Sequence, residues 1–370
     1  MVGQFLENIA NLAVRMNGEI GFNLQVLDSM KELKKLNLEY NNIDPNGIKY
    51  LGSLKQLTDL NVSCCYIGLN LSHLILLKAL THLNITSNNI RAEGAKYIGE
   101  MKQLTKLSIG SNDIGPEGAK YISGLEQLTY LNIRSNDIKK DGAKHISEMK
   151  QLTYLNVVGN HICDGGARFI SEMKQLSNLS VGYNDIGEEG AKYISELMNV
   201  SILDIGGNSI NEKGAKFIGE MKQLTDLRIY CCNIGVEGTQ YISSLNQLTH
   251  LSISTNNIGD EGAKYIGQMK QLTDLSIREN KIGIEGAKSI GQLKNLLNLY
   301  ISGNEIGDNG AQFISEMNQL TILDISSINI TPIGIKYISN MEYLTDLRII
   351  DNNIDSMGAK YQSNEAINKS

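Results

Sequence analysis

The residue types that most often carry catalysis or bind metal ions are scattered along this chain of 370 residues. The five histidines lie far apart, at His73, His82, His145, His161 and His250. Neither an HExxH motif nor a paired-cysteine spacing typical of metal sites occurs. Serines are so numerous that a Ser/His/Asp group could be chosen arbitrarily, so such a group carries little weight. We therefore expect a non-enzyme without catalytic residues, bound metal or cofactor.

The five cysteines indicate reduced thiols rather than a disulfide framework. Cys64 and Cys65 are sequence neighbours, as are Cys231 and Cys232, and neighbouring residues are poorly placed to form a disulfide with each other. An odd number of cysteines without clusters at the ends of the chain favours a reducing compartment. We expect a cytoplasmic protein.

The composition argues against several classes of protein. Hydrophobic residues make up 41% and charged residues 20% of the sequence, which fits neither a disordered chain nor a membrane protein. The longest apolar run, over residues 74–80, is interrupted by Lys78 and is too short to cross a bilayer. The net charge is −6, no basic tract occurs, and Glu7 interrupts the apolar stretch of residues 1–16 where an export signal would lie. We expect no binding to nucleic acid or to membranes.

A single internal repeat dominates the sequence. The repeat that begins at Leu104 reads LTKLSIGSNDIGPEGAKYISGLEQ, and the repeat that begins at Leu248 reads LTHLSISTNNIGDEGAKYIGQMKQ. The interval between repeats is 24 residues, except for one interval of 23 between Leu57 and Leu80. With a worn first copy at Ile9, the chain holds about 15 repeats, which start near residues 9, 33, 57, 80, 104, 128, 152, 176, 200, 224, 248, 272, 296, 320 and 344.

Each repeat has two parts with different periodicity. The first part, as in residues 152–157, alternates apolar and polar residues, which predicts a short strand with one buried face. The second part, as in residues 117–125, places apolar residues at helical spacing and predicts a short helix. A strand and a helix repeated at a fixed period make neighbouring strands parallel, through right-handed crossovers. We predict an α/β solenoid, a horseshoe with parallel strands on the concave face and short helices on the convex face.

Asparagine at position nine of the repeat supports this architecture. It occurs in twelve copies, and its amide can donate and accept hydrogen bonds where each strand turns away from the sheet. Cys65 and Cys232 take the same position in two copies, where a thiol can act as a weaker donor. Ile328 has no polar group at this position, so we expect the ladder of amides to break there.

Glycine at position fifteen, almost always followed by alanine, predicts close packing of the helix start against the strands. These glycines do not form a phosphate-binding loop. The spacing in Gly115-Pro-Glu-Gly118 differs from that motif, and no Lys-Ser/Thr pair follows at the required offset.

At these residues the chain resembles a known family. Leu128, Leu131, Ile133, Asn136 and the pair Gly142-Ala143 match the motif LxxLxLxxNxIGxxGAxxL. The chain thus resembles leucine-rich-repeat proteins of the ribonuclease-inhibitor-like class, most closely the 24-residue variant called GALA-type. The resemblance covers residues 9–359 and implies a single leucine-rich-repeat domain over residues 1–370. The repeat at Leu57 lacks the Gly-Ala pair, which predicts a locally different convex side.

The strand positions that face away from the core are candidates for binding. Side chains at positions three, five and seven, with position eight at the strand end, should point into solvent, so folding does not dictate their identity. Tyr and Arg are enriched at interface hot spots, and we expect Tyr130 and Tyr154 on adjacent strands to form an aromatic patch beside Arg134. Asn and Ser at such positions are interpreted as keeping the sheet soluble. The candidate partner-binding residues are Tyr130, Arg134, Tyr154, Tyr183, Asp226, Arg228, Tyr230, Asp274, Arg278 and Tyr300.

The leading hypothesis for function is a scaffold or adaptor that binds another protein on the concave face. The alternative is a regulator of a small GTPase, since Ran GTPase-activating proteins resemble this class, although those proteins have longer repeats and usually an acidic tail. A fragment of a surface receptor would predict an export signal and cysteine caps, which are not seen. The last strand, near residues 344–349, has only a shortened helix behind it, so the chain either continues in a longer protein or self-associates through this C-terminal edge.

Overall fold

Every strand of the structure holds three residues, at positions three to five of a repeat. The computed structural model describes residues 10–14, 27, 30–69 and 71–354. The middle residue of each described strand is a leucine, and it is buried in all of them except β1 and β15. The strands are β1 (Asn11–Ala13), β2 (Lys35–Asn37), β3 (Asp59–Asn61), β4 (His82–Asn84), β5 (Lys106–Ser108), β6 (Tyr130–Asn132), β7 (Tyr154–Asn156), β8 (Asn178–Ser180), β9 (Ile202–Asp204), β10 (Asp226–Arg228), β11 (His250–Ser252), β12 (Asp274–Ser276), β13 (Asn298–Tyr300), β14 (Ile322–Asp324) and β15 (Asp346–Arg348).

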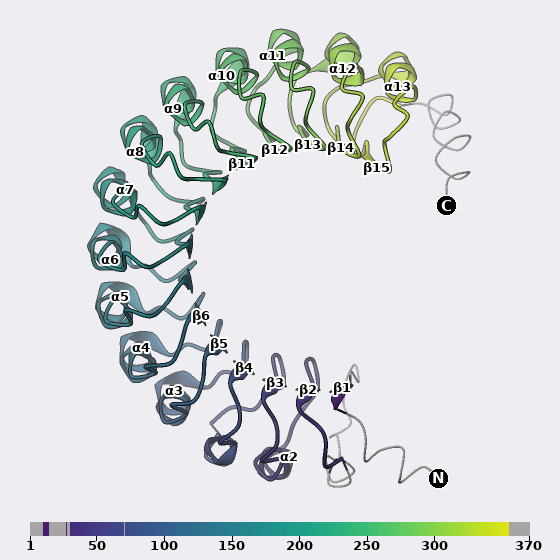
Figure 1. The fold of residues 1–370 in the computed structure, drawn as a ribbon. Coiled ribbons are helices and arrows are strands. Elements are labelled where there is room, and N and C mark those ends of the chain that lie inside the picture. The colour runs from purple at the N-terminus through teal and green to yellow at the C-terminus, as the bar shows by residue number, and fades with distance from the viewer. Residues whose placement is uncertain (1–9, 15–26, 28–29, 70, 355–370) are drawn as a thin grey trace, which may run out of the picture. The chain divides into compact units, whose positions relative to one another are not determined.

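The chain forms two compact halves, residues 1–185 and residues 186–370. Strands β1–β8 follow one another in sequence order in the N-terminal half, and β9–β15 do so in the C-terminal half. Neighbours are parallel and pair equal positions of the repeat, as Tyr130 pairs with Tyr154. Within each half the strands lie on one side and the helices on the other (Figure 1). The predicted parallel solenoid is confirmed, and the expected single domain over the whole chain stays a prediction.

The helices are short, with seven to nine residues each, and begin near position twelve of the repeat. They are α2 (Pro45–Leu51), α3 (Arg91–Gly99), α4 (Gly115–Ser123), α5 (Lys139–Ile146), α6 (Cys163–Ile170), α7 (Glu188–Ser195), α8 (Asn211–Ile218), α9 (Gly235–Ile242), α10 (Gly259–Ile266), α11 (Ile284–Ile290), α12 (Gly307–Ser315) and α13 (Pro332–Ile338). The repeat at Leu57 carries a short 3₁₀ helix, η2 (Leu74–Leu76), instead of an α-helix. The predicted local change of the helix layer at this repeat is therefore confirmed.

The Gly-Ala pair explains how closely the helices pack on the strands. A Cβ atom on Gly118 would lie 2.5 Å from the Cβ of Ile114 and 3.2 Å from the Cβ of Ala95 in the previous helix. Ala119 is fully buried. A side chain larger than hydrogen at position fifteen would push the helix away from its neighbours, so the glycine is required by space.

The asparagine ladder joins consecutive repeats as predicted. The Nδ2 atom of Asn136 donates to the carbonyls of Ile109 at 2.9 Å and Ile133 at 3.0 Å. Its Oδ1 atom accepts from the backbone N–H groups of Asn112 at 2.9 Å and Ile114 at 3.4 Å in the previous repeat. One buried amide thus satisfies backbone groups of two repeats, which would otherwise lose water without a partner.

The ladder is interrupted at Ile328, as expected. Ile328 is fully buried, and among the described residues no side-chain oxygen accepts from the backbone N–H of Asn304 in the previous repeat. The neighbouring step is intact, because the Oδ1 atom of Asn352 accepts from the Ile328 N–H at 3.0 Å. Two cysteines replace the amide as donors: the Sγ atom of Cys65 lies 3.0 Å from the Leu38 carbonyl oxygen, and Cys232 makes the equivalent contact. The position of Asn17, assigned to the first repeat, lies outside the described residues.

Candidate partner-binding surface

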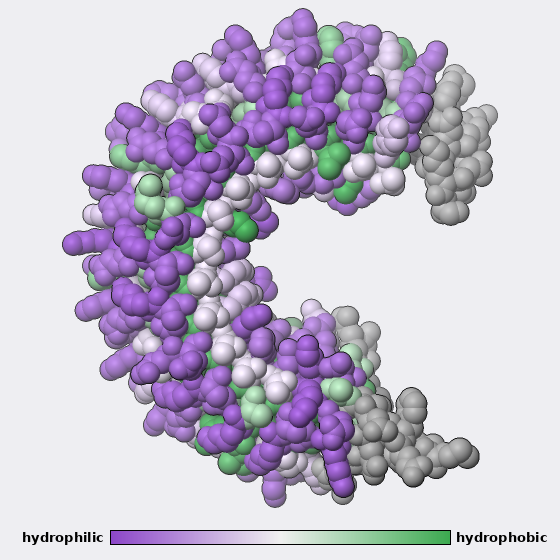
Figure 2. Space-filling model, viewed as in Figure 1, coloured by the Kyte–Doolittle hydropathy of each residue, from purple (hydrophilic) through white to green (hydrophobic). Residues whose placement is uncertain are grey.

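The candidate residues lie on the strands or directly after them. Tyr130, Tyr154, Asp226 and Asp274 occupy position three, and the leucine that follows each of them is buried in the core. Because successive side chains of a strand point to opposite faces, these residues face away from the core. Figure 2 shows hydrophilic side chains over the helices, with a paler strip toward the strands. In this view the surface beside the strands is thus less hydrophilic than the surface over the helices.

Tyr130 and Tyr154 form a stacked aromatic pair on β6 and β7. Their ring centroids lie 4.0 Å apart, and the ring planes differ by 13°. Burial raises the pKa of the Tyr130 phenol to about 12, and the hydrogen bond to Tyr154 adds to this shift. Both side chains remain half-buried, so the edge of the stack still faces solvent. The register of the sheet creates this pair, because equal positions of adjacent repeats lie side by side.

Arg134 and Tyr183 extend the surface beyond the strand ends. Arg134, at position seven, is exposed, and its side chain lies over Gly110, where a Cβ atom would be 2.8 Å from the Arg134 Cγ. No ring contact of Arg134 with either tyrosine of the pair is found among the described residues. Tyr183, at position eight, is 53% exposed. These side chains therefore add separate contact points in the N-terminal half.

In the C-terminal half a shallow depression of about 210 Å³ brings four candidates together. Asp226, Arg228, Asp274 and Tyr300 all line it, together with His250. The Arg228 guanidinium lies 3.6 Å from the Asp226 carboxylate on the same strand. A pair of opposite charges that is partly exposed to solvent is typical of the polar rim of a protein interface.

Asp274 is the most connected carboxylate of this depression. Its Oδ2 atom lies 3.2 Å from His250 Nε2 on the preceding strand and accepts from the Thr273 hydroxyl at 2.8 Å. Its Oδ1 atom accepts a hydrogen bond from the Asn298 amide on the following strand. Three neighbouring strands thus hold one carboxylate in a fixed orientation. Such preorganisation lowers the entropy lost on binding a partner.

Arg278 reaches across two strands. Its Nη2 atom lies 2.9 Å from the Asp324 carboxylate, and its Cζ atom lies 4.9 Å from the centroid of the Tyr300 ring beneath it. Asp324 is only 6% exposed and also accepts from the Ser302 hydroxyl at 3.4 Å. The Nε atom of Arg278 is buried without a hydrogen-bond partner among the described residues. The guanidinium is thus fixed by an aromatic ring and a carboxylate.

The Tyr230 ring packs against Gly206 of the previous repeat. A Cβ atom on Gly206 would lie 2.5 Å from the Tyr230 ring, so the ring covers the glycine of the previous repeat. Asp204, two residues before Gly206, is half-buried, and burial raises the pKa of its carboxyl despite the nearby Arg228. The glycine of one repeat thus leaves room for the large ring of the next repeat.

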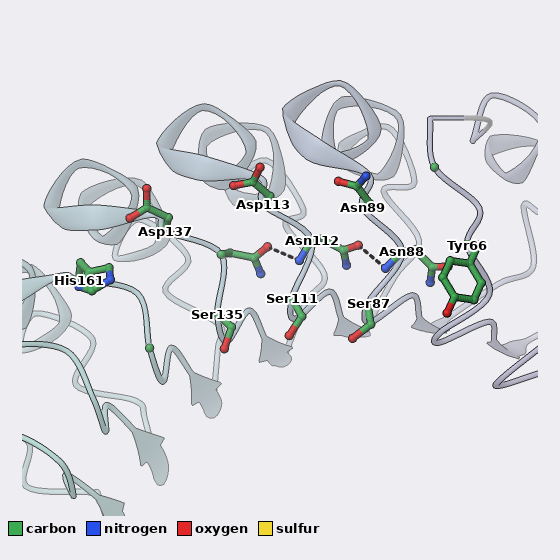
Figure 3. A pocket seen from close by; sticks show the side chains of 13 residues that line it. Tyr66, Ser87, Asn88, Asn89, Ser111, Asn112, Asp113, Ser135, Asp137 and His161 are labelled. Carbon is green, nitrogen blue, oxygen red and sulfur yellow. Dashed lines mark hydrogen bonds between the residues drawn. The ribbon is translucent and has the colours of Figure 1, made fainter.

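The structure also brings His250 and Asp324 to these sites. Both lie at strand positions that the sequence predicts to face solvent, although they are not among the ten candidate residues. A second site was missed entirely: an open groove of about 670 Å³ along the turns that follow β3 to β7, with Tyr66 at one end and His161 at the other (Figure 3). Its signal in the sequence is a polar residue at both position eight and position ten.

Metal-binding clusters and membrane-spanning helices were also sought. Within the described ranges, no group of three or more His, Cys, Asp or Glu side chains could hold a metal ion. No helix there combines the length and the apolar character that crossing a bilayer requires.

Comparisons with known proteins agree with the geometry of the repeat. A family model described as "Leucine-rich repeat region" matches residues 19–287, and a second, described as "Leucine Rich repeat", matches residues 292–315. No curated protein matches the chain.

Two solved structures have a similar fold. An internalin from Listeria monocytogenes is 23% identical, covers 94% of this chain and 89% of its own, and has a TM-score of 0.56. A leucine-rich-repeat protein from Leptospira interrogans is also 23% identical, covers 97% of this chain and 94% of its own, and has a TM-score of 0.60. At this level of identity the likeness concerns the fold alone.

Proposed function

Because the chain belongs to the leucine-rich-repeat family, we propose that it is a scaffold that binds a protein partner on its strand face. Repeats of this family commonly serve as protein-interaction modules, since stacking leaves an extended surface that the core does not use. The partner would be held by the side chains at positions three, five and seven, with position eight at the strand ends. This proposal concerns the surface defined by the ten candidate residues.

The stacked pair of Tyr130 and Tyr154 is the observation that carries the proposal. Two half-buried rings, 4.0 Å apart, offer a large contact area that is already ordered before a partner arrives. Aromatic side chains lose little entropy on binding and are frequent at interface hot spots. Folding does not require a tyrosine at either position, because other repeats place Lys106 or Asn178 there. The presence of two tyrosines at these positions is therefore better explained by partner binding than by a contribution to folding stability.

Affinity capture from the native cell tests the proposal. The double substitution Tyr130→Ala with Tyr154→Ala should abolish capture of the partner, while circular dichroism stays unchanged. The matched control is Tyr97→Ala with Tyr121→Ala, which removes two half-buried tyrosines from helices α3 and α4 on the opposite side. Retained capture by the strand-face variant, or equal loss in the control, would discard the aromatic pair as the binding site.

We also propose that this partner is met in the cytoplasm. All five cysteines are free thiols in the structure, and free thiols are typical of a reducing compartment. Fractionation of the native cell tests this location, and recovery of the protein in the secreted fraction would contradict it. The alternative function, regulation of a small GTPase, rests on resemblance alone, and no described residue adds support to it.

A further inference from the structure

The groove on the turns of the N-terminal half is distinct from the strand face. Figure 3 shows Ser87, Ser111 and Ser135 along one wall and Asn89, Asp113 and Asp137 along the other, beside the helix starts. Tyr66 and His161 lie at its two ends. The groove follows five consecutive repeats, which at the usual strand spacing is a length of roughly 20 Å. Its volume, about 670 Å³, lies in the range of ligand-binding clefts.

The asparagines on the floor of the groove offer no free amide group to a ligand. It is formed by Asn88, Asn112 and Asn136, which are buried and whose amides bond to the carbonyls and N–H groups of adjacent repeats. The backbone N–H groups of Ser87 and Ser111 donate to the next repeat at 2.9 and 2.8 Å.

The walls, in contrast, present polar side chains that are available. No hydrogen bond of the Ser87, Ser111 or Ser135 hydroxyl occurs among the described residues, and the same holds for the Asp113 carboxylate and the Asn89 amide. Hydroxyl and amide groups donate and accept, whereas a carboxylate accepts. Two parallel rows of such groups, repeated at one step per repeat, match a ligand that carries many hydroxyls along its length.

The charge of the groove argues against a strongly charged ligand. Asp137 is paired with Lys139 at 3.1 Å, and His161 is paired with Asp185 at 2.9 Å. Among the lining residues this leaves Asp113 as the carboxylate without an ion-pair partner. A single carboxylate among hydroxyls and amides suits a neutral ligand, because it can accept hydrogen bonds from hydroxyl groups.

Tyr66 supplies the apolar contact that such a ligand needs. Its side chain is 82% exposed at the end of the groove, so neither packing nor folding accounts for a tyrosine there. The face of an aromatic ring packs against the C–H groups of a sugar ring, while the phenol stays in water. We propose that the groove from Tyr66 to His161 binds a neutral oligosaccharide chain.

This ligand class differs from the protein partner proposed for the strand face, and the two sites use different residues. The groove is lined mainly by residues at positions eight to ten, in the turns. In this half the candidates Tyr130 and Tyr154 lie on strands, Arg134 and Tyr183 follow strands, and none of the four lines the groove. Loss of either activity would leave the other intact.

Calorimetric titration of the full chain with neutral hexasaccharides of glucose, mannose, galactose and N-acetylglucosamine tests the proposal. At least one should bind, and Tyr66→Ala should weaken its binding by about tenfold or more. Tyr343→Ala, which removes another exposed tyrosine outside the groove, should leave the affinity unchanged. Failure of all four sugars to bind at millimolar concentration, or equal affinity of the Tyr66→Ala variant, would overturn the proposal.

Two substitutions at Asp113 separate a sugar from a basic peptide. Asp113→Asn keeps the hydrogen-bonding capacity and the shape, so sugar binding should persist, whereas Asp113→Ala should weaken it several-fold. Hexalysine serves as the charged probe. Binding of hexalysine that Asp113→Asn abolishes, without binding of any hexasaccharide, would replace the sugar by a basic peptide and refute the inference. Unchanged circular dichroism spectra confirm that each variant is folded.

Discussion

Asn160 shows at the scale of one residue how the repeats are joined. Its Nδ2 atom donates to the carbonyls of Ile133 at 3.0 Å and Val157 at 2.9 Å. Its Oδ1 atom accepts from the backbone N–H groups of Asn136 at 2.9 Å and Ile138 at 3.3 Å. The side chain is fully buried, so water cannot replace it.

We therefore expect Asn160→Ala to lower the free energy of unfolding by about 1–3 kcal/mol, because it leaves buried backbone groups unpaired. Urea unfolding followed by circular dichroism measures the change. Asn178→Ala, at a half-buried strand position, is the control and should change stability by less than about 0.5 kcal/mol. Equal stability of the Asn160 variant and the parent would mean that the ladder does not stabilise the fold.

The phenol of Tyr130 makes stability depend on alkaline pH. Its pKa is raised from 10.0 to about 12 in the folded chain, mainly by burial. Between these two values the unfolded chain loses a proton that the folded chain keeps, so this group lowers stability as the pH rises through that window. Below pH 10 it has no such effect.

The parent should therefore lose stability relative to Tyr130→Phe as the pH rises above 10. Urea unfolding midpoints of both proteins at a series of pH values from neutral to strongly alkaline measure this difference. A constant difference across the series would show that the pKa of Tyr130 is the same in both states.

At the scale of the element, each helix is placed by the small residues that let it approach its neighbours. In α4 a Cβ atom on Gly118 would meet Ile114 at 2.5 Å and Ala95 at 3.2 Å. Alanine is a better helix former than glycine, so an isolated helix would gain stability from the exchange. In this packing the steric conflict outweighs that gain.

We expect Gly118→Ala to destabilise the protein by about 1–3 kcal/mol, the usual cost of overfilling a packed core. Thermal unfolding measures it, with Lys120→Ala on the exposed face of the same helix as the control. A more stable Gly118→Ala variant would show that helix propensity, and not space, governs position fifteen.

At the scale of the whole molecule, β15 is the last strand that the structure describes, and its apolar side chains are unusually exposed. Leu347 takes the position that is buried in every strand from β2 to β14, yet it is 38% exposed in β15, and Ile350 beside it is 68% exposed. A strand with exposed apolar side chains can pair with another copy of itself. We therefore expect the chain to self-associate through β15.

Sedimentation velocity over a range of protein concentrations tests this expectation. Ile350→Lys should shift the equilibrium toward the monomer, because it places a charge on the apolar edge. Met198→Lys is the matched control, since Met198 is 70% exposed in the same half but lies away from β15. A monomer at all concentrations, or equal effects of both variants, would contradict self-association at this edge.

Much of the fold could be predicted from the sequence, because each repeat contacts mainly the repeats next to it. Leu131, Asn136 and Gly142 have separate tasks in the core, the ladder and the helix start, and each recurs at the same position. A constant period therefore specifies the strands, the helices and the register together. The register also explains why the proximity of Tyr130 to Tyr154 could be predicted, because equal positions of adjacent repeats lie side by side in a parallel sheet.

The tertiary structure decided which side chains act together across several repeats. Arg278 reaches Asp324 over the Tyr300 ring, a contact across 46 residues of sequence that depends on side-chain direction rather than on period. Tyr66, Ser111 and His161 line one groove because five consecutive turns lie side by side in the folded chain. Periodicity by itself determines which residues are buried, since burial is a property of one repeat and its neighbours. The shape and charge of a surface arise from the directions of many side chains at once, so they appear only in the folded chain.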